Sequence, residues 1–187
     1  MKIEILTLPE IRHVYRHLLK YDFPDDERKP LSRIEKSLER GQYLCYGMKD
    51  GAGTAAYAFF VVIEDVYLLD YYAVRKDLRS SGIGSGFLEE LNRSCFGEAV
   101  CVLVEVDDPS FAGSEEEKTV RERRLAFYLR NGLLDTGACA RTFGADFRIL
   151  EFPLGEPHSE AEAGAFYSQI YRSLLPKRIY EQMVKIS

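Results

Sequence analysis

The chain has 187 residues, a length typical of one domain with at most a short appendage. Apolar residues make up 46% and charged residues 29%, which excludes a largely disordered protein. The 25 basic and 30 acidic residues give a net charge of −5. This charge argues against nucleic acid as the main partner, because phosphate binding needs a basic surface.

No run of about 18 uncharged apolar residues occurs, so we expect no membrane-spanning helix and no membrane partner. The first 19 residues lack the apolar stretch of a signal peptide, because charged side chains interrupt them at Glu4, Glu10, Arg12 and Arg16. The sequence therefore predicts a cytoplasmic protein.

The cysteines and histidines show no zinc-binding spacing. The four cysteines form no Cys-x-x-Cys pair, and we expect reduced, mostly buried thiols at Cys45, Cys95, Cys101 and Cys139. His13 and His17 share one face of a predicted helix, but Val14 stands where a zinc protease has glutamate. Since no third ligand is evident, the sequence predicts no metal site.

Apolar periodicity and turn residues predict the elements in chain order. In the first half, strands are expected over residues 2–6, 43–48, 54–63 and 66–74, and helices over residues 9–20 and 30–40. In the second half, helices are expected over residues 82–95 and 114–130, and strands over residues 100–106, 133–143 and 146–152. The turn of the last strand pair is placed at Gly144 and Ala145. The order predicts an α/β protein with a mixed sheet covered by helices on both faces.

A break rich in proline and glycine at residues 153–157 divides the chain into a domain of residues 1–153 and an extension of residues 154–187. Helices are expected over residues 161–175 and 177–184. The extension is too short to be an independent domain. It could be a docked helical pair or a partner-binding helix.

The segment between residues 71 and 88 combines the end of a strand, a basic turn and a glycine-rich entry into a helix. Such an entry leaves the first N–H groups of the helix unpaired at the positive end of its dipole, a geometry that binds phosphate. Gly82 and Gly84 would let an anion approach the backbone, and Arg79 adds positive charge. A flexible helix entry without a ligand has the same pattern.

Two other phosphate motifs do not match. No Gly-x-x-x-x-Gly-Lys-Ser/Thr string occurs, which excludes a P-loop. The third glycine of a dinucleotide-binding turn comes one place early, at Gly86, and Phe87 occupies its position.

Arg79-x-x-Gly82-x-Gly84, after a strand ending at Val74, resembles motif A of the GCN5-related N-acetyltransferases (GNAT), which binds the pyrophosphate of coenzyme A. Residues 124–133 are similar to motif B of that family, a helix carrying Phe-Tyr that ends in Gly-Phe, with Leu133 in place of phenylalanine. The order of elements over residues 1–153 also matches. The resemblance does not reach residues 155–187 and does not identify an acceptor.

The resemblance implies the acyl-coenzyme A N-acyltransferase fold, a mostly antiparallel central sheet flanked by helices, with the fourth and fifth strands splayed apart. In that family the pantetheine arm of the cofactor lies in the gap. Its partners here would be the backbone groups of Tyr72, Ala73 and Val74, which would also polarise the thioester carbonyl. The pyrophosphate would be held by motif A, at Arg79, Ser80, Ser81, Gly82, Ile83 and Gly84.

The resemblance also implies catalytic roles. Tyr128 would be the general acid that protonates the departing thiolate, although its position also suits a core aromatic residue. Glu105 or Asp70 would be the general base, and for each a structural carboxylate is an equal alternative. A water relay, or an amine deprotonated in solution, would need no base at all.

Two further sets of charged residues each have two interpretations. Arg124, with Arg121 on the same predicted helix, would meet cofactor phosphates or form a solvated face paired with nearby glutamates. The acidic residues of the loop between the first two helices would face a cationic acceptor or belong to an ordinary polar loop: Asp22, Asp25, Asp26 and Glu27.

The sequence thus predicts an N-acetyltransferase that transfers the acetyl group of acetyl-coenzyme A directly to a primary amine of a small molecule or peptide, without a metal. The alternative is a coenzyme A-binding module without catalysis. The oligomeric state is open, and the C-terminal helices could mediate a homodimer.

Overall fold

The computed structural model describes residues 2–25 and 27–187 and has a mixed α/β architecture. The chain forms two compact units. The first runs to Val62 and resumes over Leu69–Cys95, and the second comprises Ile63–Leu68 and Phe96–Ser187. Among the helices of these described residues, none has the length and apolar character needed to cross a membrane.

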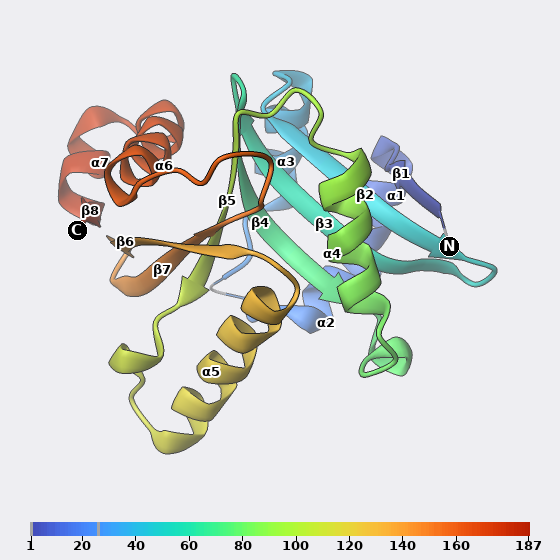
Figure 1. The fold of residues 1–187 in the computed structure, drawn as a ribbon. Coiled ribbons are helices and arrows are strands. Elements are labelled where there is room, and N and C mark those ends of the chain that lie inside the picture. The colour runs from blue at the N-terminus through green and yellow to red at the C-terminus, as the bar shows by residue number, and fades with distance from the viewer. Residues whose placement is uncertain (1, 26) are drawn as a thin grey trace. The chain divides into compact units, whose positions relative to one another are not determined.

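The first unit contains antiparallel strands flanked by short helices (Figure 1). Its elements are β1 (Lys2–Ile5), α1 (Leu8–Val14), the π-helical segment η1 (Tyr15–Leu19), α2 (Lys20–Asp22), α3 (Leu31–Glu39), β2 (Tyr43–Asp50), β3 (Gly53–Ile63), β4 (Val66–Val74), the 3₁₀ turn η2 (Lys76–Leu78) and α4 (Ile83–Ser94). The register pairs Ile3 with Met48 and Cys45 with Phe59. Apolar burial stabilises the unit, and Phe59 on β3 and Phe87 on α4 are fully buried.

The second unit has the strand order β5-β7-β6-β8, with antiparallel pairs throughout. Its elements are β5 (Cys101–Asp107), the 3₁₀ turn η3 (Pro109–Phe111), α5 (Glu115–Arg130), β6 (Leu134–Thr142), β7 (Ala145–Glu151), α6 (Glu160–Leu174), α7 (Lys177–Met183) and β8 (Val184–Ile186). Figure 1 shows α6 and α7 (red) beside the end of the sheet, where α6 contacts β6 and β8.

Strand β4 belongs to both units. Val66–Leu68 lie in the second unit, and Leu69–Val74 lie in the first. Within the second unit, the N–H of Val100 donates to the C=O of Asp65 at 2.9 Å, at the point where β4 and β5 begin. The fourth strand thus begins in the second unit and ends in the first.

The predicted elements agree with the structure to within a few residues, with three differences. The first predicted helix contains the π-helical segment and continues to Asp22. The predicted turn at Gly144 and Ala145 lies one residue earlier, where Phe143 and Gly144 have φ of 51° and 90°. Positive φ at both positions gives the tight turn that matches the twist of a hairpin.

The third difference is at the C-terminal end. The last predicted helix ends at Met183, and the following residues form β8, which pairs with β6 through Thr142 and Val184. Helix α6 buries Ala163 and Tyr167 within the second unit. The extension is therefore docked, whereas the division of the chain at residue 153 stays a prediction.

Helix α6 begins with a capping box in which the N–H of Glu162 donates to Ser159 Oγ at 3.3 Å. Replacing this serine (Ser159→Ala) should lower the free energy of unfolding by about 1 kcal/mol, because the N–H loses its acceptor. Exposed Ser173 on the same helix supplies the matched control, Ser173→Ala. Chemical denaturation followed by circular dichroism measures both variants, and equal stabilities would contradict the capping role.

Candidate functional site

The turn between β4 and α4 has an unusual backbone. Ser80 has φ of 62°, and Gly82, the N-cap of α4, has φ of 87°. A left-handed conformation costs a residue with a side chain roughly 1–2 kcal/mol, and glycine adopts it freely. Strain of this kind concentrates at ligand-binding turns.

This backbone leaves the start of α4 without hydrogen-bond acceptors. The first amide of the helix to be paired is that of Gly86, which donates to the C=O of Gly82 at 3.0 Å. In the part of the chain that the structure describes, the N–H groups of Ile83, Gly84 and Ser85 have no acceptor. A Cβ built on Gly82 would meet open space. The exposed amides at the positive end of the helix dipole fit a phosphate group.

The side chain of Tyr72 connects β4 to the first turn of α4. Its hydroxyl donates to the C=O of Gly84 at 2.5 Å, and its ring stacks on Phe87 with centroids 5.6 Å apart. These contacts hold the amides of α4 in place relative to the end of β4.

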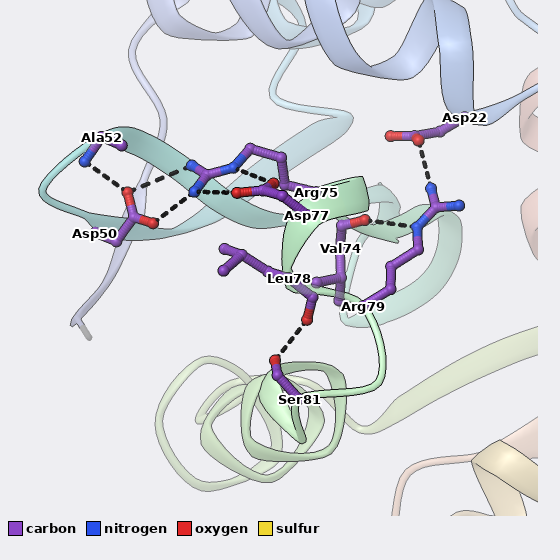
Figure 2. Close-up of polar contacts among 9 residues, drawn as sticks. All are labelled: Asp22, Asp50, Ala52, Val74, Arg75, Asp77, Leu78, Arg79 and Ser81. Atoms are coloured by element: carbon purple, nitrogen blue, oxygen red, sulfur yellow. Dashed lines mark hydrogen bonds and ion pairs between the residues drawn. The ribbon is translucent and has the colours of Figure 1, made fainter.

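Arg75 fixes the other side of the turn, as Figure 2 shows. Its guanidinium donates to Asp50 at 2.9 Å and to Asp77 at 2.8 Å, and Asp50 accepts from the N–H of Ala52 at 2.8 Å. The hydrogen bonds from Arg75 hold the pKa of Asp50 and of Asp77 below their usual values. The β2–β3 hairpin and the turn after β4 are thereby joined.

Arg79 is directed toward α2 (Figure 2). It donates to the C=O of Val74 at 3.0 Å and to Asp22 at 2.6 Å, and Asp22 also accepts from the hydroxyl of Tyr57 at 2.9 Å. The Asp22 side chain is 5% exposed. In this arrangement Arg79 shapes the turn from its outer side.

The acidic residues at the end of α2 and in the following loop differ in burial and in their partners. Asp22 is buried and paired, whereas Asp25 is exposed and forms an ion pair with Arg28. Glu27 contributes its C=O, which accepts from Tyr71 at 3.2 Å. Asp26 lies outside the described residues.

In the second unit, Tyr128 lies near the end of α5 and is 7% exposed. Burial raises its pKa to about 12, against a smaller lowering by Arg124. The helix ends through Gly132, which has φ of 89°, and the N–H of Leu133 donates to the C=O of Tyr128 at 3.2 Å. Leu133, which replaces the phenylalanine of motif B, is buried.

Glu105 is partly exposed on β5 and accepts hydrogen bonds from two tyrosines of α6. The hydroxyl of Tyr171 donates to Oε1 at 2.7 Å, and that of Tyr167 donates to the same oxygen. Tyr167 also bonds to Thr142 at 2.7 Å. The sequence analysis missed both tyrosines, although their i, i+4 spacing places them on one helix face.

Asp70 on β4 has charged and polar partners. Its carboxylate accepts from the ammonium of Lys29 at 2.6 Å and from the hydroxyl of buried Tyr43. Burial raises the pKa of Tyr43 well above its usual value, with a smaller contribution from Asp70, so this tyrosine stays neutral. This environment is that of an ion-paired structural carboxylate.

Two arginines of α5 form ion pairs within the second unit. Arg124 donates to Asp107 at 2.7 Å and is 51% exposed. Arg121 donates to Glu117 at 2.6 Å, one helical turn earlier. The Arg121–Glu117 pair is a helical pair of the kind that the sequence analysis described, whereas Arg124 pairs with Asp107 of β5. The exposure of Arg124 leaves its guanidinium accessible.

No protein-family model and no curated protein matches the sequence. Solved structures are similar in fold. A protein from Bacteroides thetaiotaomicron assigned to the GNAT acetyltransferases has a TM-score of 0.67 and 19% identity, over 90% of this chain and 94% of its own. An aminoglycoside 6′-N-acetyltransferase complexed with coenzyme A has a TM-score of 0.57 and 12% identity, over 81% and 96%.

The ribosomal-protein-S18-alanine N-acetyltransferase from Escherichia coli has a TM-score of 0.53 and 19% identity, over 84% of this chain and 97% of its own. These likenesses agree with the mixed sheet flanked by helices. The chain therefore has the fold of the GCN5-related N-acetyltransferases.

Proposed function

We propose that this protein is an N-acetyltransferase that transfers the acetyl group of acetyl-coenzyme A to a primary amine by direct nucleophilic attack. The observation that carries this proposal is the set of unpaired amides at Ile83, Gly84 and Ser85, behind a left-handed glycine at the end of β4. A similar structure of this fold is described as complexed with coenzyme A.

In the proposed complex, the amides of α4 and of the preceding residues Ser80–Gly82 hold the pyrophosphate. The backbone groups of Tyr72, Ala73 and Val74 pair with the pantetheine arm. A fixed N–H near the thioester carbonyl stabilises the negative charge that develops on its oxygen during attack. Exposed Arg124 is proposed to exchange Asp107 for a cofactor phosphate.

Tyr128 is the proposed general acid. The departing thiolate needs a proton, and a phenol whose pKa is raised to about 12 stays protonated at neutral pH.

Glu105 is the preferred candidate for the general base, with Asp70 as the competitor. The preference rests on the ion pair of Asp70, whose carboxylate is held by the ammonium of Lys29. Glu105 accepts hydrogen bonds from Tyr167 and Tyr171 on α6.

The acceptor is proposed to be a small-molecule or peptide amine, because similar structures are named for both classes. The net charge of −5 favours a cationic acceptor through long-range attraction. A cytoplasmic location is proposed from the sequence.

The first test concerns the amides of α4. Gly82→Ala should weaken coenzyme A binding by about tenfold, because alanine disfavours φ of 87° and the turn reorients. Gly41→Ala is the matched control, since Gly41 has φ of 68° in the same unit and also faces open space. Calorimetry should show a binding loss only for Gly82→Ala. Equal affinity of the two variants would refute the proposed phosphate site.

The second test separates the enzyme from a module that only binds coenzyme A. Tyr128→Phe should lower kcat by about 100-fold at unchanged cofactor affinity, since the proton donor is lost. Tyr46→Phe is the control, because Tyr46 is equally buried at 7% exposure and has no assigned role. Release of free thiol with a panel of amines measures both. Binding of acetyl-coenzyme A without turnover of any amine would favour the non-catalytic module.

The third test uses pH. An acid acts while it is protonated, that is below its pKa, and the pKa of Tyr128 is about 12. We therefore expect kcat to show no alkaline decline below about pH 10, the ordinary pKa of tyrosine. A decline centred below that value, absent in Tyr128→Phe, would show that Tyr128 loses its proton too early for the assigned role.

The fourth test compares the two carboxylates. Glu105→Gln should lower kcat/KM for the amine by about 100-fold, and the loss should shrink at high pH where the amine is already neutral. Asp70→Asn should reduce thermal stability by breaking the Lys29 pair, with a smaller effect on rate. The opposite order of the rate effects would make Asp70 the base.

A further inference from the structure

Three side chains that the proposed acetyl transfer does not use gather in the second unit. Cys101 begins β5, Glu151 ends β7, and His158 lies in the turn before α6. They contribute a sulfur, a carboxylate oxygen and an imidazole nitrogen, all within 4.8 Å of one another. The sequence analysis predicted no metal site and did not connect these residues.

The sheet register brings the first two together. Leu103 pairs with Glu151 across the antiparallel β5–β7 pair, and Cys101 lies two residues before Leu103 on the same face. Diagonal neighbours of this kind are within reach of each other, and Cys101 Sγ lies 4.0 Å from Glu151 Oε2.

The third side chain is held by its own backbone and by α6. The N–H of His158 donates to Glu151 Oε1 at 3.0 Å, and its Nδ1 lies 2.9 Å from Oε2. The imidazole ring packs edge-on against Phe166 with centroids 5.1 Å apart. Backbone and ring contacts together restrict the histidine to a position that faces the carboxylate and the thiol.

Two of the three side chains are buried, and all three line a cavity that is partly open to solvent. Cys101 is 1% exposed and Glu151 is 3% exposed, so the thiol and the carboxylate are shielded from water. Both residues and His158 line a cavity of about 210 Å³ that is partly open to solvent. The carboxylate is paired with His158, and a metal ion between them would hold the same charge in place of that contact.

We propose that Cys101, Glu151 and His158 bind a divalent transition metal ion of the zinc class, with water from the cavity as the fourth ligand. Thiolate and imidazole together favour Zn²⁺ over Mg²⁺ or Ca²⁺, which prefer oxygen ligands alone. A thiolate and a carboxylate also balance the two positive charges, so the occupied site is neutral and suits a buried position.

The present spacing is close to that of a tetrahedral zinc site. Ligand distances of about 2.0–2.3 Å place neighbouring ligand atoms roughly 3.3–3.8 Å apart. The observed 2.9 Å and 4.0 Å lie on either side of this range, and all ligand atoms lie within 4.8 Å of one another, so shifts of about 1 Å suffice. Binding replaces the thiol proton, which passes to solvent, and the neutral imidazole coordinates through Nδ1 with its own proton on Nε2.

The expected role is structural, because the ion would join β5, β7 and the turn that leads into α6. This inference is independent of the proposed acetyl transfer, since it uses none of the residues assigned there. Binding to the folded protein alone would raise its stability.

The test uses the full chain, freed of metal by a chelator and titrated with Zn²⁺, and separately with Co²⁺ as a spectroscopic probe. One equivalent of Zn²⁺ should bind and raise the thermal midpoint. Bound Co²⁺ should give the thiolate charge-transfer band and the visible bands of a tetrahedral site. His158→Gln, Cys101→Ser and Glu151→Gln should each weaken Zn²⁺ binding by more than the roughly 100-fold that loss of an outer-shell partner costs.

Two matched controls make the result specific to this site. Cys139→Ser removes another free cysteine and should leave the thiolate band unchanged. The double variant His13→Gln/His17→Gln removes a histidine pair of the first unit, whose rings lie 4.6 Å apart, and should leave the single equivalent unchanged. If a variant at buried Cys101 or Glu151 fails to fold by circular dichroism, His158→Gln decides, since this residue lies in a partly exposed turn.

Absence of saturable Zn²⁺ binding would overturn the proposal. Stoichiometric binding that survives His158→Gln, or that disappears only in the His13/His17 variant, would also overturn it.

Discussion

Unpaired backbone amides at the start of α4 are the feature on which the functional proposal depends. An amide without an acceptor is costly when it is buried and useful when it faces an anion. The left-handed Gly82 directs the chain into the helix so that no preceding side chain caps those amides. The same geometry that leaves these N–H groups without acceptors is suited to a phosphate group.

The neighbouring side chains maintain this arrangement. Tyr72 holds the first turn of α4, Arg75 attaches the turn to the β2–β3 hairpin, and Arg79 attaches it to Asp22 on α2. Arg79, which the sequence analysis assigned to the pyrophosphate, and Arg75 are thus both paired with carboxylates. In this first unit, both arginines help to position the backbone of the turn.

In the second unit, β5 places polar groups on one face at alternate positions. Cys101 and Glu105 both lie on this face, near the turn before α6 and beneath α6 itself. The C-terminal extension supplies Tyr167 and Tyr171 to Glu105, and His158 to Glu151. The extension thereby contributes hydrogen-bond partners to two polar clusters of the unit.

Local pattern in the sequence determined the order and the approximate bounds of the elements, the glycine-rich entry to α4 and the two motifs of the acetyltransferase family. These features depend on residues close together in the chain, because helix caps, turns and apolar periodicity are local. The tertiary structure alone decided that β8 pairs with β6, that Arg79 pairs with Asp22, and that Cys101 meets Glu151 and His158. Those contacts join residues distant in sequence, and only strand register and helix packing bring such side chains to one place.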